Sequence, residues 1–327
     1  MQIYTEIPEI VKKIVTDFPP SFLDKLAQLP PSPKTEASSG QKTLLKRAKA
    51  KYFTRGITNE LRKLDSDLHK SYINTYFCAN ELTQSGQKIT AKYCNSRICI
   101  VCNRIRTAKL IVGYKEVLQS LPCKYFVTLS RPNVPGLELR EEIKSILHEV
   151  RLMQKALSKQ KCAIIGIRKL ECTYNPVTDD FHPHLHFIVS GYQNAVKMRE
   201  MWLKRNVTAG IKAQDIRKAN EDSIMELFKY FSKIVTKEHI YIKALDTIMR
   251  AMYGLRTFQP MGVKKAKIVT EDIEELQSQI YSDLEQRETH WSWIESDWID
   301  RSTGETLTGY EPSANIVTLL QNIVTDK

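Results

Sequence analysis

The sequence predicts an α+β fold in which a central antiparallel sheet is covered by helices. Three observations lead to this fold class. Strand-like and helix-like segments are interspersed over residues 106–237, two strand-like segments flank a turn with one proline and two aspartates, and no glycine-rich phosphate loop follows a strand-like segment. The last observation disfavours a dinucleotide-binding fold with a parallel sheet.

The individual elements follow from hydrophobic periodicity and residue type. The segment KYFVTLS (124–130) is rich in β-branched and aromatic residues and is typical of a buried strand. Further strands are predicted over 162–175 and 181–191, on either side of the turn, and near 210–218. Helical spacing of apolar residues predicts helices over 43–56, 106–121, 138–160, 193–206 and 221–237.

Composition divides the 327 residues into four segments. The first, 1–42, is an N-terminal piece that ends in a linker rich in Pro, Ser and Lys over 28–42. Residues 43–106 contain a basic helix and four cysteines, and residues 107–270 contain the alternating strands and helices. Residues 271–327 are acidic and contain Trp291, Trp293 and Trp298, so this segment is not expected to be a plain disordered tail.

The charge is distributed unevenly. The chain has 49 Lys and Arg against 37 Asp and Glu, a net charge of +12. Residues 271–327 contain 3 basic and 13 acidic residues, a net charge of −10, which leaves +22 for residues 1–270. An anionic partner is expected, nucleic acid first and an acidic membrane surface second. No apolar run approaches a membrane span and the start does not resemble a secretory signal, so a soluble, cytoplasmic protein without membrane attachment is expected.

Four cysteines are grouped in the second segment. Cys78 precedes Cys94, Cys99 and Cys102 in the segment YCNSRICIVCNR. Two close thiolates and two further ones suit tetrahedral Zn²⁺, and reduced thiols are the rule in the cytosol. A structural zinc site is therefore predicted, with His69 as an alternative to Cys78; a redox pair is the competing interpretation. The basic residues expected to bind DNA here are Lys92, Arg97, Arg104 and Arg106. Outside the group, Cys123, Cys162 and Cys172 are expected to be small core residues.

The segment FHPHLHFIV places three histidines at alternate positions. On a strand, His182, His184 and His186 share one face, and the core face carries Phe181, Leu185, Phe187 and Val189. The turn is centred between residues 177 and 178, so paired positions have numbers that sum to 355. Glu171 then lies opposite His184. A carboxylate beside two imidazoles suits a divalent cation such as Mg²⁺ or Mn²⁺, although a one-residue slip would turn Glu171 away.

The predicted helix over 221–237 has a polar face beside its apolar stripe. Glu226, Tyr230 and Lys233 share this face at positions i, i+4 and i+7. A half-buried packing role is the ordinary interpretation of such a tyrosine. Close to a metal-polarised phosphate, however, its phenol is suited to attack phosphorus and form a phosphotyrosine. Lys229 and Lys237 on the same helix are expected to bind DNA.

These segments, in this order, resemble the motifs of HUH endonucleases. KYFVTLS resembles the first motif, LECTYN with FHPHLHFIV the second, and ELFKYFSK the third. Within that superfamily the chain is most similar to rolling-circle plasmid replication initiators with one catalytic tyrosine, and the cysteine segment and LRTFQPMG (255–262) extend the resemblance over about residues 43–265. Ser130 stands where the first motif ordinarily has threonine, and Ile100 where the cysteine segment often has proline.

The resemblance implies an HUH-type sheet and a nicking reaction. His184 and His186 would bind the catalytic metal with Glu171 as a third ligand and His182 in a supporting role. Tyr230 would be the nucleophile, Glu226 would activate water to end the reaction, and Lys233 would steady the phosphate or the phenolate. The expected substrate is a replication origin with a single-stranded or hairpin nick site, and the 3′-OH that is left would prime synthesis with a host helicase and polymerase.

Two other interpretations remain open at this point. A transposase or conjugative relaxase uses the same fold, but relaxases commonly have the tyrosine before the histidines, and here Tyr230 follows them. A zinc-containing DNA-binding regulator without catalysis would leave the histidine and tyrosine groups unexplained.

Overall fold

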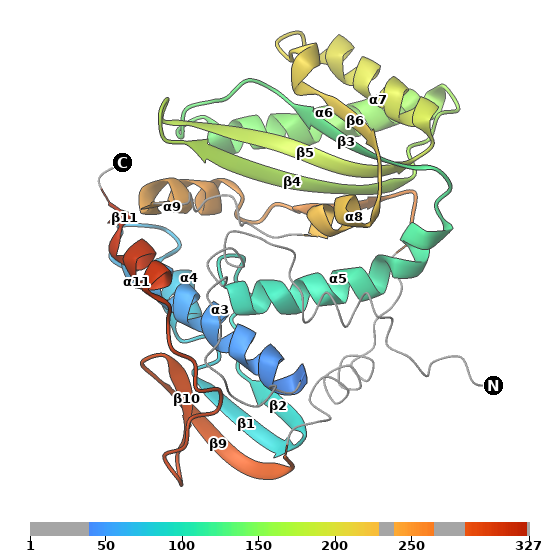
Figure 1. The fold of residues 1–327 in the computed structure, drawn as a ribbon. Coiled ribbons are helices and arrows are strands. Elements are labelled where there is room, and N and C mark those ends of the chain that lie inside the picture. Colours follow the sequence, from blue (N-terminus) through green and yellow to red (C-terminus); the bar gives the residue numbers. More distant parts are fainter. Residues whose placement is uncertain (1–38, 229–238, 265–284, 326–327) are drawn as a thin grey trace, which may run out of the picture. The chain divides into compact units, whose positions relative to one another are not determined.

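The computed structural model describes residues 39–228, 239–264 and 285–325 (Figure 1). These residues form two compact units. Unit 1 contains 39–112, 239–242 and 285–325, and unit 2 contains 113–228 and 243–264. Both units combine helices with antiparallel sheets, so the predicted α+β class is confirmed. No helix of the described segments is both long enough and apolar enough to cross a membrane.

Unit 2 is built on a five-stranded antiparallel sheet. The strand order is β6-β3-β5-β4-β8. The strands are β3 (Lys124–Ser130), β4 (Gly166–Asn175), β5 (Asp180–Ser190), β6 (Asp215–Lys218) and β8 (Phe258–Met261). The first four confirm predicted strands. Two are shorter than expected: β4 begins four residues later, and a 3-10 turn, η1 (Ile211–Ala213), precedes β6.

The hairpin between β4 and β5 has the predicted register. Asn175 pairs with Asp180 across the turn, and Glu171 pairs with His184, so paired numbers sum to 355 along the whole ladder. Asp179 adopts a left-handed conformation with φ of 52° at the last turn position, which aspartate tolerates better than most residues. The alternation that this register sets puts Glu171 and the histidines on one face.

Helices cover both faces of this sheet (Figure 1). On one face lie α6 (Leu139–Lys159) and α7 (Tyr192–Arg205), which pack on β3 and β5. The predicted core residues of β5 are buried there: Phe181, Leu185, Phe187 and Val189. The other face carries α8 (Glu221–Phe228), which packs on β5, and α9 (Ile242–Ala251) also belongs to unit 2. The predicted helix over 221–237 is described as far as Phe228.

Unit 1 contains a four-stranded antiparallel sheet whose strands come from distant parts of the chain. The order is β10-β9-β1-β2, formed by β1 (Glu81–Gly86), β2 (Lys88–Ala91), β9 (Arg287–Ile294) and β10 (Asp297–Asp300). None of these strands was predicted. Because β9 pairs with β1, part of the acidic segment 271–327 belongs to the same unit as the cysteines.

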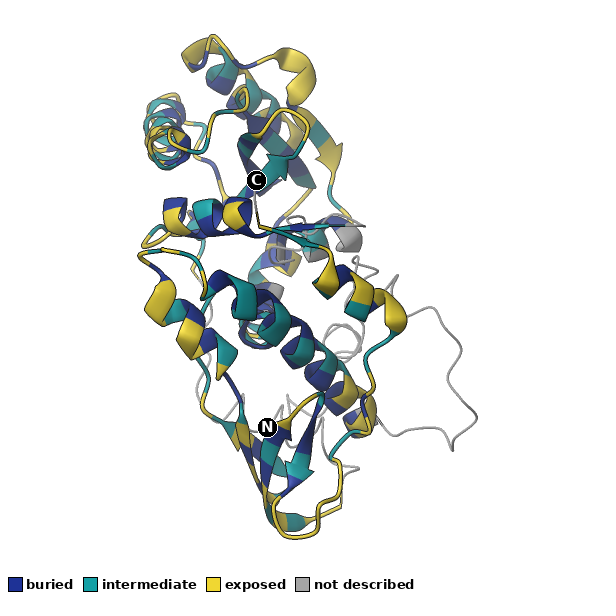
Figure 2. Ribbon diagram, turned by 90° about the vertical axis from the view of Figure 1, so that its left-hand side faces the viewer, coloured by how far each residue is buried: buried dark blue, intermediate teal, exposed yellow. Residues whose placement is uncertain are grey.

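The helices of unit 1 surround a largely buried α3 (Ser39–Leu61) (Figure 2). This helix begins inside the segment 28–42, so the prediction that residues 39–42 belong to a linker was wrong. The others are α4 (His69–Tyr76), the first part of α5 (Ile100–Ser120) and α11 (Ala314–Gln321). A short parallel pair joins β7 (Ile240–Tyr241) to β11 (Ile323–Val324).

Candidate metal centres and nucleic-acid interface

Four cysteines converge in unit 1. Their sulfurs lie within 4.8 Å of one another, and Cys102 Sγ is 3.5 Å from Cys78 Sγ and 3.7 Å from Cys94 Sγ. Tetrahedral Zn²⁺ with sulfur ligands requires about this spacing. Since Cys78 completes the group, His69 is not needed as a fourth ligand. All seven cysteines are free of disulfide bonds.

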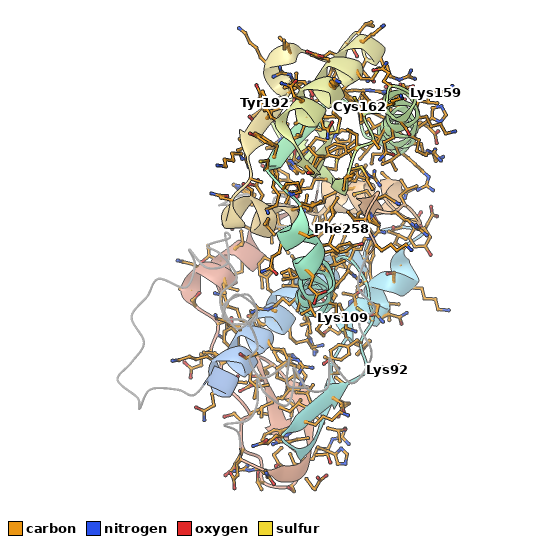
Figure 3. All side chains as sticks on the ribbon, turned by 90° about the vertical axis from the view of Figure 1, so that its right-hand side faces the viewer. Lys92, Lys109, Lys159, Cys162, Tyr192 and Phe258 are labelled. Carbon is orange, nitrogen blue, oxygen red and sulfur yellow. The ribbon has the colours of Figure 1, made fainter. Side chains whose placement is uncertain are left out.

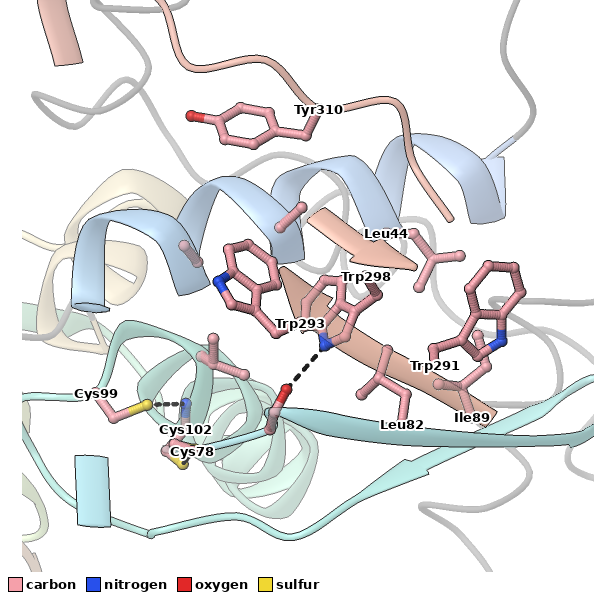
Figure 4. Packing of buried hydrophobic residues seen from close by; sticks show 14 residues of the cluster. Leu44, Cys78, Leu82, Ile89, Cys99, Cys102, Trp291, Trp293, Trp298 and Tyr310 are labelled. Carbon is pink, nitrogen blue, oxygen red and sulfur yellow. Dashed lines mark hydrogen bonds between the residues drawn. The ribbon is translucent and has the colours of Figure 1, made fainter. Parts of the chain in front are cut away.

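Tryptophans from the C-terminal strands belong to the same apolar core as the clustered cysteines (Figure 4). Trp293 and Trp298 pack edge to face with ring centroids 4.7 Å apart, and the Trp298 indole donates a hydrogen bond of 2.8 Å to the Ala79 carbonyl. Trp298 and Cys99 are fully buried. Three of the four clustered cysteines are therefore buried in an apolar core, and Cys94 is half-buried at its edge. The other cysteines differ from the prediction that all three are core residues: Cys172 is buried, but Cys162 is half-buried and Cys123 is exposed.

The second cluster lies on the face of the unit 2 sheet that α8 partly covers. Glu171 Oε2 is 3.4 Å from His184 Nε2 and 3.3 Å from His186 Nε2. The register explains the convergence, because Glu171 is directly opposite His184 and adjacent to His186 on the same face. His182 also shares the face, with its ring 5.0 Å from that of His184.

Hydrogen bonds to Nδ1 orient both imidazoles. His184 Nδ1 donates to the carbonyl of His182 at 2.9 Å, and His186 Nδ1 lies 3.0 Å from Thr128 Oγ1 on β3. With Nδ1 protonated, Nε2 of each neutral ring carries the lone pair that a metal needs, and both Nε2 atoms face Glu171. His186 Nε2 is buried and forms no hydrogen bond of its own. Thr128 was not predicted, although the first motif contains it.

The electrostatics keep the cluster in a metal-binding protonation state. Burial would raise the pKa of Glu171, but the charge of Lys169 and the two adjacent imidazoles hold that pKa well below its usual value. Burial lowers the pKa of His186, more than its contact with Glu171 raises it. An ionised carboxylate beside a neutral imidazole is the state in which both can bind a cation.

Lys169 links this cluster to α8. It is 5% exposed, lies opposite His186, and forms an ion pair with Oε1 of Glu171. Its Nζ also donates to the backbone carbonyl of Glu226 at 3.2 Å. One buried ammonium therefore contacts both the carboxylate of the cluster and the backbone of α8. Sequence reasoning missed Lys169, since one lysine in a strand carries no distinctive signal.

The side chain of Glu226 has a different partner from its backbone carbonyl. Its Oε2 accepts a hydrogen bond of 2.9 Å from Arg217 on β6. Arg217 also pairs with Asp215 at 3.0 Å, and its guanidinium lies 4.3 Å from the ring centroid of Phe126. Tyr230, Lys233, Lys229 and Lys237 lie outside the described residues.

The basic residues predicted to bind DNA near the cysteines are all in unit 1. Lys92 is exposed (Figure 3), and the three arginines are half-buried. Arg106 donates to Asn103 Oδ1 and to the carbonyl of Asn95, both at 2.6 Å, so this guanidinium supports the loop between the cysteines.

Comparisons with known proteins agree with this arrangement. A "Protein rep" of Staphylococcus aureus is 30% identical over 183 residues, which are 49% of this chain and 79% of the relative. A "Protein rep" of Streptococcus pneumoniae serotype 2 is 28% identical over 200 residues, 54% of this chain and 62% of the relative. One from a Bacillus species is 29% identical over 110 residues, 32% of this chain and 36% of the relative.

No solved structure matches the chain significantly. The family model of Rep_1, described as replication protein, matches residues 86–301, which are more than half of the chain. The match includes Glu171, His184 and His186 and all the clustered cysteines except Cys78. The resemblance to rolling-circle plasmid replication initiators is thereby confirmed, and the chain belongs to the Rep_1 family of replication proteins.

Proposed function

We propose that the chain initiates rolling-circle replication by nicking single-stranded DNA at an origin, with Tyr230 as the nucleophile. The observation that carries this proposal is the cluster of Glu171, His184 and His186. Its imidazoles are oriented through Nδ1, and its Nε2 atoms converge on an ionised carboxylate. A DNA-binding regulator without catalysis has no use for such a buried, charged group, which is costly to desolvate.

The two clusters suit two different cations. Three nitrogen and oxygen ligands fit Mg²⁺ or Mn²⁺ at Glu171, His184 and His186, whereas the four sulfurs of unit 1 fit Zn²⁺. A divalent cation bound by Glu171, His184 and His186 would polarise the scissile phosphate and offset charge that develops on it. Unit 2 is then the HUH-type nicking domain, with His182 supporting its neighbour His184.

The residues of the chain act in sequence. The phenolate oxygen of Tyr230 attacks phosphorus, a 5′-phosphotyrosine forms, and the 3′-oxygen leaves, takes up a proton and becomes the hydroxyl that primes synthesis. Lys233 steadies the phosphate charge. Glu226 later takes a proton from water, whose oxygen then displaces the tyrosine. Arg217 holds the Glu226 carboxylate in place, 2.9 Å away.

The remaining partners follow from this role. Basic residues of the chain bind origin DNA, among them Lys92, Arg97 and Arg104 near the cysteines, and Lys229 and Lys237 on either side of Tyr230 in the sequence. A host helicase and polymerase extend the 3′-OH.

The decisive experiment replaces the nucleophile. Tyr230→Phe removes only the phenolic oxygen, so it should abolish nicking of a labelled single-stranded origin oligonucleotide while binding is unchanged. Mass spectrometry of the wild-type adduct should find the DNA on the peptide that contains Tyr230. Tyr241→Phe is the control, since Tyr241 has no glutamate four residues earlier. Nicking by Tyr230→Phe, or an adduct on another tyrosine, contradicts the proposal.

A further inference from the structure

We propose that unit 1 carries a second DNA site, which binds an unpaired base of single-stranded DNA. The site, called the Phe77 platform below, consists of Phe77 and Tyr76 at the end of α4 with Arg55 and Arg62 of α3. It does not include the Glu171, His184 and His186 cluster. Binding there needs no DNA cleavage and is independent of the role proposed for Tyr230.

The aromatic part of the platform is exposed. Phe77 is 53% exposed, although it directly follows a helix and precedes the buried Cys78. Its ring packs edge to face against Tyr76, with centroids 5.1 Å apart. Ile73, one turn earlier on α4, is also exposed. Apolar surface of this kind is costly in water and marks an interaction site when it is contiguous.

Two guanidinium groups flank the same aromatic pair. The Cζ atoms of Arg55 and Arg62 lie 4.4 and 4.3 Å from the ring centroid of Tyr76. Among the described residues no ion pair with a carboxylate falls on either arginine; Glu60 pairs with Lys63 at 2.6 Å, and Arg62 donates a hydrogen bond of 2.9 Å to Asn59 Oδ1. The platform therefore combines an open aromatic face with positive charge that no ion pair of the described residues neutralises.

This combination matches the chemistry of an unpaired nucleotide. A base stacks on an aromatic ring, and the phosphates on either side accept hydrogen bonds from guanidinium groups. In a duplex the bases are already stacked on each other and present no free face to Phe77. A protein partner would find apolar surface here but would need acidic groups to meet both arginines. Single-stranded DNA supplies the base and the phosphates together.

The platform is held in place by the framework of the cysteine cluster. Lys51 Nζ donates to the carbonyls of Tyr76 at 3.1 Å and Cys78 at 2.6 Å, on either side of Phe77. The backbone that carries the exposed ring is thus fixed by a buried lysine of α3. A rigid aromatic anchor loses little conformational entropy when a base binds.

The test uses the full chain and a labelled oligothymidylate, which lacks an origin sequence, without added divalent cation. Phe77→Ala should weaken binding about tenfold by fluorescence anisotropy, and Phe77→Trp should preserve binding, because any aromatic ring can stack. Arg55→Gln combined with Arg62→Gln should weaken binding and reduce its salt dependence. A duplex of the same length should bind Phe77→Ala and Phe77→Trp as tightly as it binds the wild type. Only the double arginine variant should bind the duplex more weakly.

The matched control is Tyr192→Ala in unit 2. Tyr192 is 51% exposed and packs on Tyr125 with centroids 5.2 Å apart, but none of the cation–ring contacts found in the described segments falls on it (Figure 3). This variant should bind oligothymidylate normally. Bound zinc and near-ultraviolet circular dichroism would show whether Phe77→Ala leaves the neighbouring cysteine cluster intact.

Three results would overturn the proposal. They are unchanged oligothymidylate binding by Phe77→Ala, equal weakening of that binding by Tyr192→Ala, and equal weakening of single-strand and duplex binding by Phe77→Ala. A change in oligomeric state without a change in DNA affinity would assign the platform to a protein contact instead. Loss of nicking by Tyr230→Phe leaves this result unaffected, so the two proposals fail separately.

Discussion

Each unit contains a cluster of metal-ligating side chains with one buried lysine beside it, and the two lysines are used differently. Lys51 is 1% exposed and donates to backbone carbonyls and to Asn80 Oδ1, so it holds the chain that frames the cysteines. Lys169 is 5% exposed and pairs with Glu171, whose carboxylate is itself one of the candidate metal ligands.

Under the proposed function, this difference separates a structural cluster in unit 1 from a catalytic one in unit 2. In unit 1 four sulfurs converge at an apolar core that contains three tryptophans, and burial lowers the pKa of Lys51 to about 8. In unit 2 three ligand atoms of the described residues converge, so a cation bound there would keep coordination positions for a phosphate. Four protein ligands fill the coordination sphere of a zinc ion, which suits a structural site. Three ligands with a charged lysine beside them leave room for a substrate phosphate, which suits a catalytic site.

The largest effect on folding is expected when a cysteine of the unit 1 cluster is replaced. Cys99→Ser removes a fully buried ligand, and because binding of structural zinc is itself folding free energy, unit 1 should not fold. Near-ultraviolet circular dichroism of the buried tryptophans and the zinc content of the purified protein measure this loss. Cys123→Ser, at an exposed cysteine outside the cluster, is the control and should behave as wild type. A folded, zinc-free Cys99→Ser protein would show that the cluster is not a structural metal site.

A smaller effect on stability is expected when Lys169 is removed from beside the Glu171, His184 and His186 cluster. Lys169→Met leaves the buried Glu171 carboxylate without its ammonium partner, which should lower the free energy of unfolding of the metal-free protein by about 3–5 kcal/mol near neutral pH. The pKa of Glu171 is depressed in the folded state, so the stabilisation is present above the unfolded pKa and is lost as the pH falls through the folded pKa.

Urea unfolding of wild type and Lys169→Met at several pH values tests this prediction. The difference between the two proteins should shrink on acidification, as Glu171 becomes protonated. Lys144→Met breaks an exposed pair with Glu141 on α6 and should cost less than about 1 kcal/mol. A pH-independent difference for Lys169→Met would mean that lost packing, not the charge pair, is responsible.

The same contrast explains how much of the molecule could be predicted from sequence. The hairpin of unit 2 is local, and its turn sets a register in which alternation decides the faces, so Glu171 could be placed opposite His184. The sheet of unit 1 pairs Leu82 with Trp291, more than two hundred residues later, and no local pattern reports such a pairing. Thr128 and Lys169 were missed for a related reason: their roles arise only when neighbouring strands are side by side.

The smallest effect on stability is expected at Thr128, whose contact with the metal-ligand cluster of unit 2 is through His186. Thr128→Val keeps the shape of the side chain but removes the hydroxyl 3.0 Å from His186 Nδ1, so the imidazole is no longer held in the tautomer that exposes Nε2. Affinity for Mn²⁺, measured by calorimetry, should fall about 10- to 100-fold. Thr128→Ser retains the hydroxyl and should bind Mn²⁺ nearly as wild type does. Because Val127 and Leu129 flank this position in the buried strand β3, both variants should unfold at about the wild-type temperature. If Thr128→Val bound Mn²⁺ normally, the orientation of His186 would have to come from Glu171 alone, and β3 would contribute packing but no chemistry to the site.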